Sequence, residues 1–334
     1  MMKCLFIFIA VIVSPFVSVF GQIALGNSCQ LVIADAKKGK QLLTANDAYL
    51  QRLSAFERSA RLKSQGPVSA DEYKNYINDS VEEWTPAQKK LVSDIFKKYS
   101  SKIAKYSHLF PKTIYLVRTT GEEECDATGY TRGNTLIVSD EIFNRGERNV
   151  EFLLMHELFH VITRANPDIR DKAYAVIGFK KCSEPKLPAA LDRRRVTNPD
   201  AMYNDYAIKI LKSKNHYWVV PMLYISHTYI SPEAQGRLFD FINMVFVAVG
   251  KGNTENPEDN KCPPYVMGMG EISGFFEQIG RNTYYVIHPE EILADNFALM
   301  LVGSIPGKKI TNRNIPRRLS SVMVNYQPHQ KVLK

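Results

Sequence analysis

The chain has 334 residues, of which 45% are hydrophobic and 23% are charged, and this balance describes a globular protein of one large or two modest domains. The formal net charge is +9, but the basic residues are scattered along the chain as short runs, which indicates solvated faces. No nucleic-acid-binding module accompanies the charge and no internal repeat is visible, so we expect no nucleic-acid partner.

The N-terminus has the pattern of a secretory signal. A lysine at position 3 is followed by an apolar stretch from Cys4 to Phe20, and small or polar residues follow at Gly21 and Gln22. We therefore interpret residues 1–21 as a signal peptide and expect a secreted or periplasmic protein with no membrane attachment after cleavage. The alternative is a retained membrane anchor, although the stretch is short and Pro15 interrupts it.

Cysteine usage fits an exported chain. If Cys4 leaves with the signal, the cysteines that remain are Cys29, Cys125, Cys182 and Cys262. An even number in an oxidising compartment favours disulfide bonds, in any of three connectivities. None of these residues has CxxC spacing, so a second metal site bound by cysteines is not expected.

Residues 22–84 are polar, poor in glycine and typical of helices, so we predict a helical N-terminal segment there. The next helix has a clear start, because Thr85, Pro86 and Gln88 form a capping box with proline at the first helical position. Apolar residues recur at helical spacing after it, up to Tyr99. We place the start of a second domain, residues 85–334, at this helix.

Two strands are predicted after this helix. Thr113–Arg118 and Thr135–Val138 are rich in β-branched residues, and they flank a stretch from Gly121 to Gly133 that contains turn residues. Any domain that mixes helices and strands could contain such a pair.

The next element carries an HExxH motif, His156-Glu157-Leu158-Phe159-His160, within an apolar run over residues 150–162. Two histidines four residues apart lie one above the other on a helix, so both imidazoles can reach one Zn²⁺. Glu157 lies about 100° around the axis, where it can face a water molecule on the metal. The apolar flanks indicate that the other faces of the helix are buried. The alternative is a core helix that carries these residues by chance.

Residues 166–280 separate this helix from the next motif, and we interpret them as a large insertion. Tyr217–Ile225 has the composition of a strand, Phe239–Val249 could be a helix or a strand, and Asn253–Pro264 reads as a surface loop. The insertion either shapes a substrate cleft or forms a structural subdomain.

A third metal ligand is expected near residue 290. Pro289 marks a helix start, and on that helix Glu291 and Asp295 are four residues apart and share one face. Glu290 has no such partner and points about 100° away, so we expect little effect from its removal.

HExxH followed on a later helix by Glu-x-x-x-Asp, here Glu291 to Asp295, resembles the gluzincin zinc metallopeptidases. The resemblance covers residues 150–164 and 284–301 and does not assign a subfamily. It implies an α+β, zincin-like fold, in which a small sheet packs on the zinc-binding helix and a large insertion precedes the third-ligand helix. It also implies that His156, His160 and Glu291 bind one Zn²⁺ per chain. Asp295 would then support a ligand histidine, fixing its tautomer.

The function that this resemblance implies is hydrolysis of peptide bonds in a protein or peptide substrate by an exported enzyme. Zinc would lower the pKa of a bound water toward ~7, and Glu157 would take the proton and later protonate the leaving nitrogen. Tyr284, Tyr285 and His288 precede the third-ligand helix and are candidates for donating a hydrogen bond to the oxyanion.

Two alternatives stay open. The protein could be a catalytically inactive, exported zinc-binding or scaffold protein of the same fold, although the intact Glu157 argues against this. Glu291 could also be misassigned, with the chain belonging to another HExxH class. The metzincin class is excluded, because Thr163 and Asn166 stand where its glycine and third histidine would be. The sequence leaves the oligomeric state and any propeptide undetermined.

Overall fold

The computed structural model describes residues 21–226, 241–307 and 311–326. The apolar stretch interpreted as a signal peptide falls almost entirely outside these residues, as does the alternative of a membrane anchor. Among the described residues, no helix is both long enough and apolar enough to cross a membrane. The chain forms an α+β structure with two sheets.

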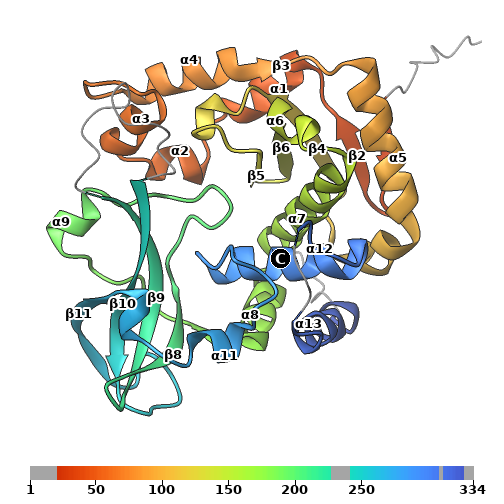
Figure 1. Ribbon diagram of the computed structural model, residues 1–334. Helices are drawn as coiled ribbons and strands as arrows, with labels where there is room; N and C mark the ends of the chain where they lie inside the picture. Colours follow the sequence, from red (N-terminus) through yellow and green to blue (C-terminus); the bar gives the residue numbers. More distant parts are fainter. Residues whose placement is uncertain (1–20, 227–240, 308–310, 327–334) are drawn as a thin grey trace, which may run out of the picture.

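The first sheet has six strands (Figure 1). Five lie in the order β1 (Gln22–Ala24), β2 (Gln30–Ile33), β4 (Thr113–Thr119), β6 (Thr135–Ser139) and β5 (Gly129–Arg132), and β3 (Val81–Glu82) pairs with the end of β4. Strands β2, β4 and β6 are parallel, and the other pairs are antiparallel. The two strands predicted from the sequence are confirmed as β4 and β6.

Strand β5 lies at the edge of this sheet and was not predicted. It joins β6 through Gly133 and Asn134, since Arg132 pairs with Thr135. Gly133 has a φ of 58°, a conformation that two-residue hairpin turns require and that glycine adopts at little cost. Four residues between turn signals are too few for a reliable pattern of alternation, so sequence patterns predict no strand here.

Helices cover both faces of the first sheet. On one face, α5 (Pro86–Ile103) and α7 (Glu147–Ala165) share the main core with Leu116 of β4. On the other face, α1 (Ala36–Leu43), α2 (Ala48–Arg52) and α4 (Ala70–Ser80) bury Val117 and Ile137, while α3 (Ala55–Arg61) follows α2. Neighbouring strand residues point to opposite faces, so Leu116 and Val117 join different layers.

This arrangement corrects the predicted helical segment of residues 22–84. The four helices are present, but the segment also contributes β1, β2 and β3 to the sheet, with β2 pairing directly with β4. The segment is therefore part of the same layered body as β4 and α7, because its strands extend one hydrogen-bonded sheet. The start of α5 is as predicted: Thr85 Oγ1 accepts a hydrogen bond from the Gln88 backbone N–H at 3.2 Å, and Pro86 is the first helical residue.

The second sheet is antiparallel and forms a separate lobe (Figure 1). Its strands lie in the order β11 (Lys261–Met267), β10 (Ile242–Lys251), β9 (Asn215–Ile225), β8 (Tyr206–Lys212) and β7 (Phe179–Lys181). They come from the predicted insertion, which also contains α8 (Pro167–Val176), α9 (Ala189–Asp192) and α11 (Phe275–Ile279). One face of the sheet joins the main core through Phe246, and the other face covers a small cluster around Trp218.

The predictions for the insertion are confirmed in part. The predicted strand at Tyr217–Ile225 is β9, and the ambiguous run before Val249 is the strand β10 from Ile242 onward, its first residues lying outside the described ranges. The predicted surface loop over 253–264 ends early, because β11 begins at Lys261. Strand β11 is an edge strand that contains two prolines, a composition that sequence patterns assign to loops.

Helices α12 (Pro289–Val302) and α13 (Asn314–Val324) complete the main core. Helix α12 begins at Pro289, as predicted, and packs against α7, where the rings of Phe159 and Phe297 lie 5.7 Å apart between centroids. All residues of α12 except Met300 are buried. Because this helix is buried on nearly every side, each of its polar side chains, including those of Glu290, Glu291 and Asp295, lies against other parts of the protein.

The expected disulfide bonds are absent among the described cysteines. Cys29 lies in the main core, Cys125 packs with Ala60 and Ile225, and Cys182 belongs to the outer cluster of the second sheet. These three side chains are buried in different apolar clusters, so their sulfur atoms have hydrophobic neighbours instead of one another. Burial raises the pKa of the Cys125 thiol to about 12, which keeps it protonated at neutral pH.

Glu123, in the turn η2 (Glu122–Glu124), gives the fold a predictable dependence on pH. The side chain is fully buried, accepts a hydrogen bond from the Tyr130 hydroxyl at 2.9 Å, and has its pKa raised by burial from 4.5 to about 7. In the unfolded chain, the Glu123 carboxyl ionises at a lower pH than in the folded protein. The contribution of this residue to the free energy of unfolding is therefore fully present below about pH 4.5 and is lost as the pH rises through about 7.

Glu123→Gln is therefore expected to raise the free energy of unfolding at pH 8 by roughly 1 to 3 kcal/mol, while the two proteins differ little at pH 4.5. Urea denaturation at both pH values measures the difference. If Glu123→Gln and the unaltered protein differ in free energy of unfolding by the same amount at both pH values, the raised pKa of Glu123 is contradicted.

Candidate metal centre

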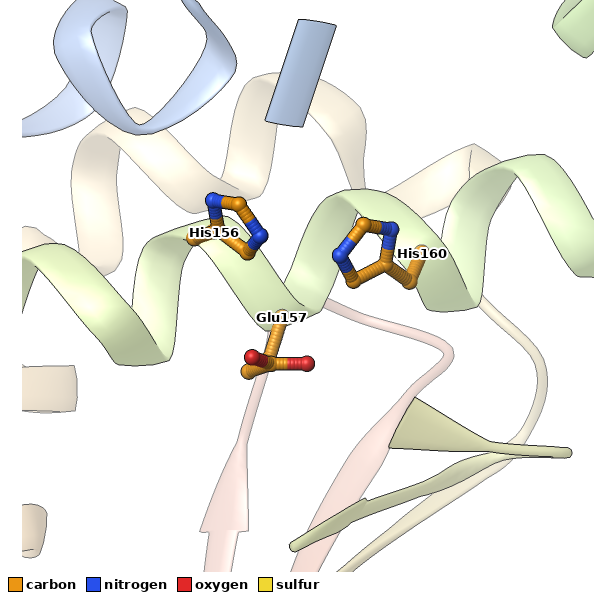
Figure 2. A group of neighbouring side chains, drawn as sticks. All are labelled: His156, Glu157 and His160. Atoms are coloured by element: carbon orange, nitrogen blue, oxygen red, sulfur yellow. The ribbon is translucent and has the colours of Figure 1, made fainter. Parts of the chain in front are cut away.

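The two histidines of the HExxH motif lie one turn apart on α7, and Glu157 comes from the helix between them (Figure 2). All three side chains are buried, and one ligand atom from each lies within 4.8 Å of the others. The i, i+4 spacing accounts for the shared direction of the imidazoles. The structure therefore contains a buried group that is able to hold a metal ion.

A carboxylate lies behind each imidazole. His156 Nδ1 is 2.8 Å from Asp295 Oδ1, and His160 Nδ1 is 2.9 Å from Glu290 Oε1. Because an ionised carboxylate only accepts hydrogen bonds, each Nδ1 is the donor of its pair, and each Nε2 is the nitrogen left to bind a metal ion. Asp295 thus lies behind a histidine of the motif, and it also accepts a hydrogen bond from the Thr283 hydroxyl.

The hydrogen bonds of Glu290 contradict the expectation that its side chain points away from the site and that its removal has little effect. Besides His160 Nδ1, it accepts hydrogen bonds from the Thr163 hydroxyl at 2.5 Å and from the Tyr174 hydroxyl. The Glu290 side chain does point in a different direction from that of Glu291, as the helix geometry requires. Helix α12 packs closely across α7, however, so both side chains reach residues of α7, and Glu290 also reaches Tyr174 of the neighbouring helix α8. The spacing of residues on one helix could not reveal this crossing.

Glu291 lies between the two imidazoles. Its Oε2 atom is 3.1 Å from His156 Nε2 and 3.6 Å from His160 Nε2. Donors around a tetrahedral Zn²⁺ with bonds of about 2.1 Å are about 3.4 Å apart, so these separations fit three ligands of one ion. His160 Nε2 is buried and has no hydrogen-bond partner among the described residues, as a nitrogen reserved for a metal would be.

Asn198 and Asp200 belong to the site and were not predicted. Asn198 Nδ2 donates a hydrogen bond to Glu291 Oε1 at 2.5 Å. Asp200 Oδ1 accepts one from the Thr131 backbone N–H at 2.6 Å and lies 3.9 Å from His160 Nε2. His160, Asp200 and Glu291 form a second group whose ligand atoms lie within 4.8 Å of one another. Asn-Pro-Asp is a common turn sequence, so the letters carry no signal of this role.

Glu157 faces the cavity with one defined partner. The Thr131 hydroxyl, from the edge strand β5, donates a hydrogen bond to Glu157 Oε2 at 2.6 Å. Burial raises the pKa of Glu157 to about 7, against the opposing effects of His156 and of this hydrogen bond. A carboxylate whose pKa lies near neutrality can both take up and release a proton.

Burial and close contact also shift the pKa values of Asp200 and His156. Burial and the neighbouring Glu157 and Glu291 carboxylates raise the pKa of Asp200 well above its usual range, although His160 opposes this. Burial would lower the pKa of His156, but hydrogen bonds to Asp295 and Glu291 outweigh burial and raise it well above its usual range. Both shifts follow from the burial of several carboxylates and two imidazoles in one place.

A cavity of about 370 Å³ opens onto these residues. Tyr285 lines it, and its ring centroid is 6.4 Å from that of His156. Tyr284 is 87% exposed and does not line the cavity. His288 is buried and caps α12, with Nδ1 accepting a hydrogen bond from the Glu290 backbone N–H at 3.1 Å. Of the three predicted oxyanion donors, only Tyr285 lies at the cavity.

Comparisons of the chain with protein-family profiles, with curated proteins and with solved structures found no match. The class of the site is therefore defined by its own geometry: a buried group of two histidines and several carboxylates, set between two crossed helices, with the donor atoms spaced to hold a metal ion.

Proposed function

We propose that the protein is an exported zinc metallopeptidase of gluzincin type. The observation that carries the proposal is the position of Glu291 Oε2, 3.1 and 3.6 Å from the Nε2 atoms of two histidines whose Nδ1 atoms are both held by carboxylates. Two imidazoles and one carboxylate on a pair of helices leave one coordination position open, which is typical of catalytic zinc sites.

Zinc, when bound, supplies a Lewis acid that lowers the pKa of water and polarises a carbonyl group. His156, His160 and Glu291 would hold it. Asp295 and Glu290 keep the two imidazoles in the tautomer that presents Nε2. Glu157, oriented by the Thr131 hydroxyl, takes a proton from water and returns it to the leaving nitrogen.

The surroundings favour a peptide as substrate. The cavity is lined on one side by Gly129, the first residue of the edge strand β5, so an extended peptide can approach the edge of a sheet there. The Tyr285 hydroxyl is the group that we assign to the oxyanion. Its partly exposed ring lies at the cavity beside His156.

The alternative is a zinc-binding scaffold protein without turnover. Both readings require zinc, so only a test of hydrolysis separates them. An inactive relative has no need to keep the glutamate of the HExxH motif, whereas Glu157 is present, buried and held by the Thr131 hydroxyl, and this residue therefore favours the enzyme.

Incubation of the purified mature protein with casein and with a peptide library tests the proposal. We expect cleavage that a zinc chelator abolishes and that added zinc restores, and no cleavage by Glu157→Gln. Stoichiometric zinc without cleavage by the unaltered protein would favour the scaffold. N-terminal sequencing of the exported chain tests the proposed cleavage near Gln22.

A further inference from the structure

A second cavity, of about 270 Å³, adjoins the metal cavity. The two cavities share four lining residues: Ala127, Gly129, Asp200 and Tyr285. The second cavity therefore lies beside the metal cavity, on the side where β5 and the segment 196–200 meet.

The walls of the second cavity are mainly apolar, and the side chains that form them include Val196, Leu223, Ile242 and Ile287. Three of these four come from the insertion: Leu223 from β9, Ile242 from β10, and Val196 from the segment before Asp200. None of the four belongs to α7 or α12. The size of this cavity can therefore be altered without changing a residue on the helices of the metal group.

The cavity also touches one ion pair, Arg61 with Glu124, whose Nε and Oε2 atoms are 2.9 Å apart. The arginine also donates to the Thr197 carbonyl at 3.0 Å, and the glutamate accepts hydrogen bonds from two tyrosine hydroxyls, those of Tyr49 and Tyr73. Both side chains are buried and engaged with each other. The pair therefore presents no unpaired charge to a ligand. Because the other charged residue of the lining, Asp200, is acidic, an anionic group entering the cavity would lose water without gaining a partner.

We propose that this cavity is a specificity pocket that receives a large apolar side chain, such as that of leucine or phenylalanine, from the substrate residue next to the scissile bond. The inference rests on the proposed peptidase function. The pocket has room for one large side chain, and full burial of such a side chain corresponds to about 10- to 100-fold in affinity. The pocket disfavours aspartate, because its arginine, Arg61, is already paired with Glu124 and the other charged residue of its lining, Asp200, is acidic.

Binding of hydroxamate probes to the zinc-loaded protein tests the pocket without requiring turnover. Two series carry the side chain of glycine, alanine, leucine, phenylalanine, aspartate or lysine on either side of the chelating group. In the series whose side chain enters the pocket, we expect the leucine or phenylalanine probe to bind about 10- to 100-fold more tightly than the glycine probe, and the aspartate probe to bind no better than the glycine probe.

Leu223→Trp fills the pocket and is expected to remove this preference while leaving the affinity for the glycine probe unchanged. Leu211→Trp, at a half-buried position on β8 that does not line either cavity, is the matched control and should keep the preference. Circular dichroism checks that both variants fold.

The proposed pocket is wrong if the probes of both series bind with equal affinity, or if the preference for apolar probes survives in Leu223→Trp. This conclusion holds whether or not casein is cleaved. The opposite result, a preference for apolar probes without any hydrolysis of casein or peptides, would uphold the pocket and overturn only the proposed reaction.

Discussion

Replacement of Glu157 with glutamine is expected to leave zinc bound and to lower kcat by about 10² to 10⁴, the usual contribution of proton transfer by a positioned side chain. Glutamine can still accept the hydrogen bond that the Thr131 hydroxyl donates to Glu157 at 2.6 Å, so the geometry of the site survives. It cannot accept a proton from water. Metal analysis of the purified variant, together with its rate of peptide hydrolysis, measures both effects.

The matched variants are His160→Ala and Glu291→Ala, each of which should lose zinc as well as activity, because two remaining protein ligands rarely hold the ion. The contrast between retained and lost zinc separates a residue that moves protons from residues that bind metal. Turnover near that of the unaltered protein in Glu157→Gln would refute the proposed mechanism.

Replacement of Glu290 with alanine is expected to weaken zinc affinity about 10- to 100-fold, although the residue is not a predicted ligand. The variant removes the acceptor that holds His160 Nδ1 at 2.9 Å, so the imidazole loses its fixed tautomer and orientation. It also leaves the buried Tyr174 hydroxyl without its acceptor, at about 1 to 3 kcal/mol of stability, whereas the Thr163 hydroxyl still has the His160 carbonyl at 3.2 Å.

Competitive titration with a zinc-binding dye measures the affinity, and urea denaturation measures the stability. Tyr174→Phe is the control for stability, because it removes one hydrogen bond to Glu290 and leaves His160 held. Glu277→Ala, at an exposed glutamate on α11, controls for the loss of a carboxylate elsewhere. If Glu290→Ala loses stability while its zinc affinity stays that of the unaltered protein, Glu290 is a packing residue and does not position His160.

Local sequence patterns were sufficient for the elements that the site is built on. His156 and His160 share a face because helical spacing alone requires it, and Pro289 begins α12 because proline lacks the N–H that a first helical residue leaves unbonded. The pair Glu291 and Asp295 follows from the same spacing. The capping box at Thr85 and the strands β4 and β6 are equally local, and all of them are present in the structure.

Only the tertiary structure decided which residues complete the site. Glu290 holds His160 because α12 is buried on all sides and crosses α7 at its first turn, and Asn198 and Asp200 reach Glu291 and His160 from a segment more than ninety residues away from Glu291 in sequence. The edge strand β5 and the sharing of one sheet by residues 22–84 also depend on pairing between distant segments. A periodic pattern fixes the direction of a side chain relative to its own helix or strand. The partner that it meets depends on how separate elements cross, and the free energy of that packing is spread over side chains throughout the core.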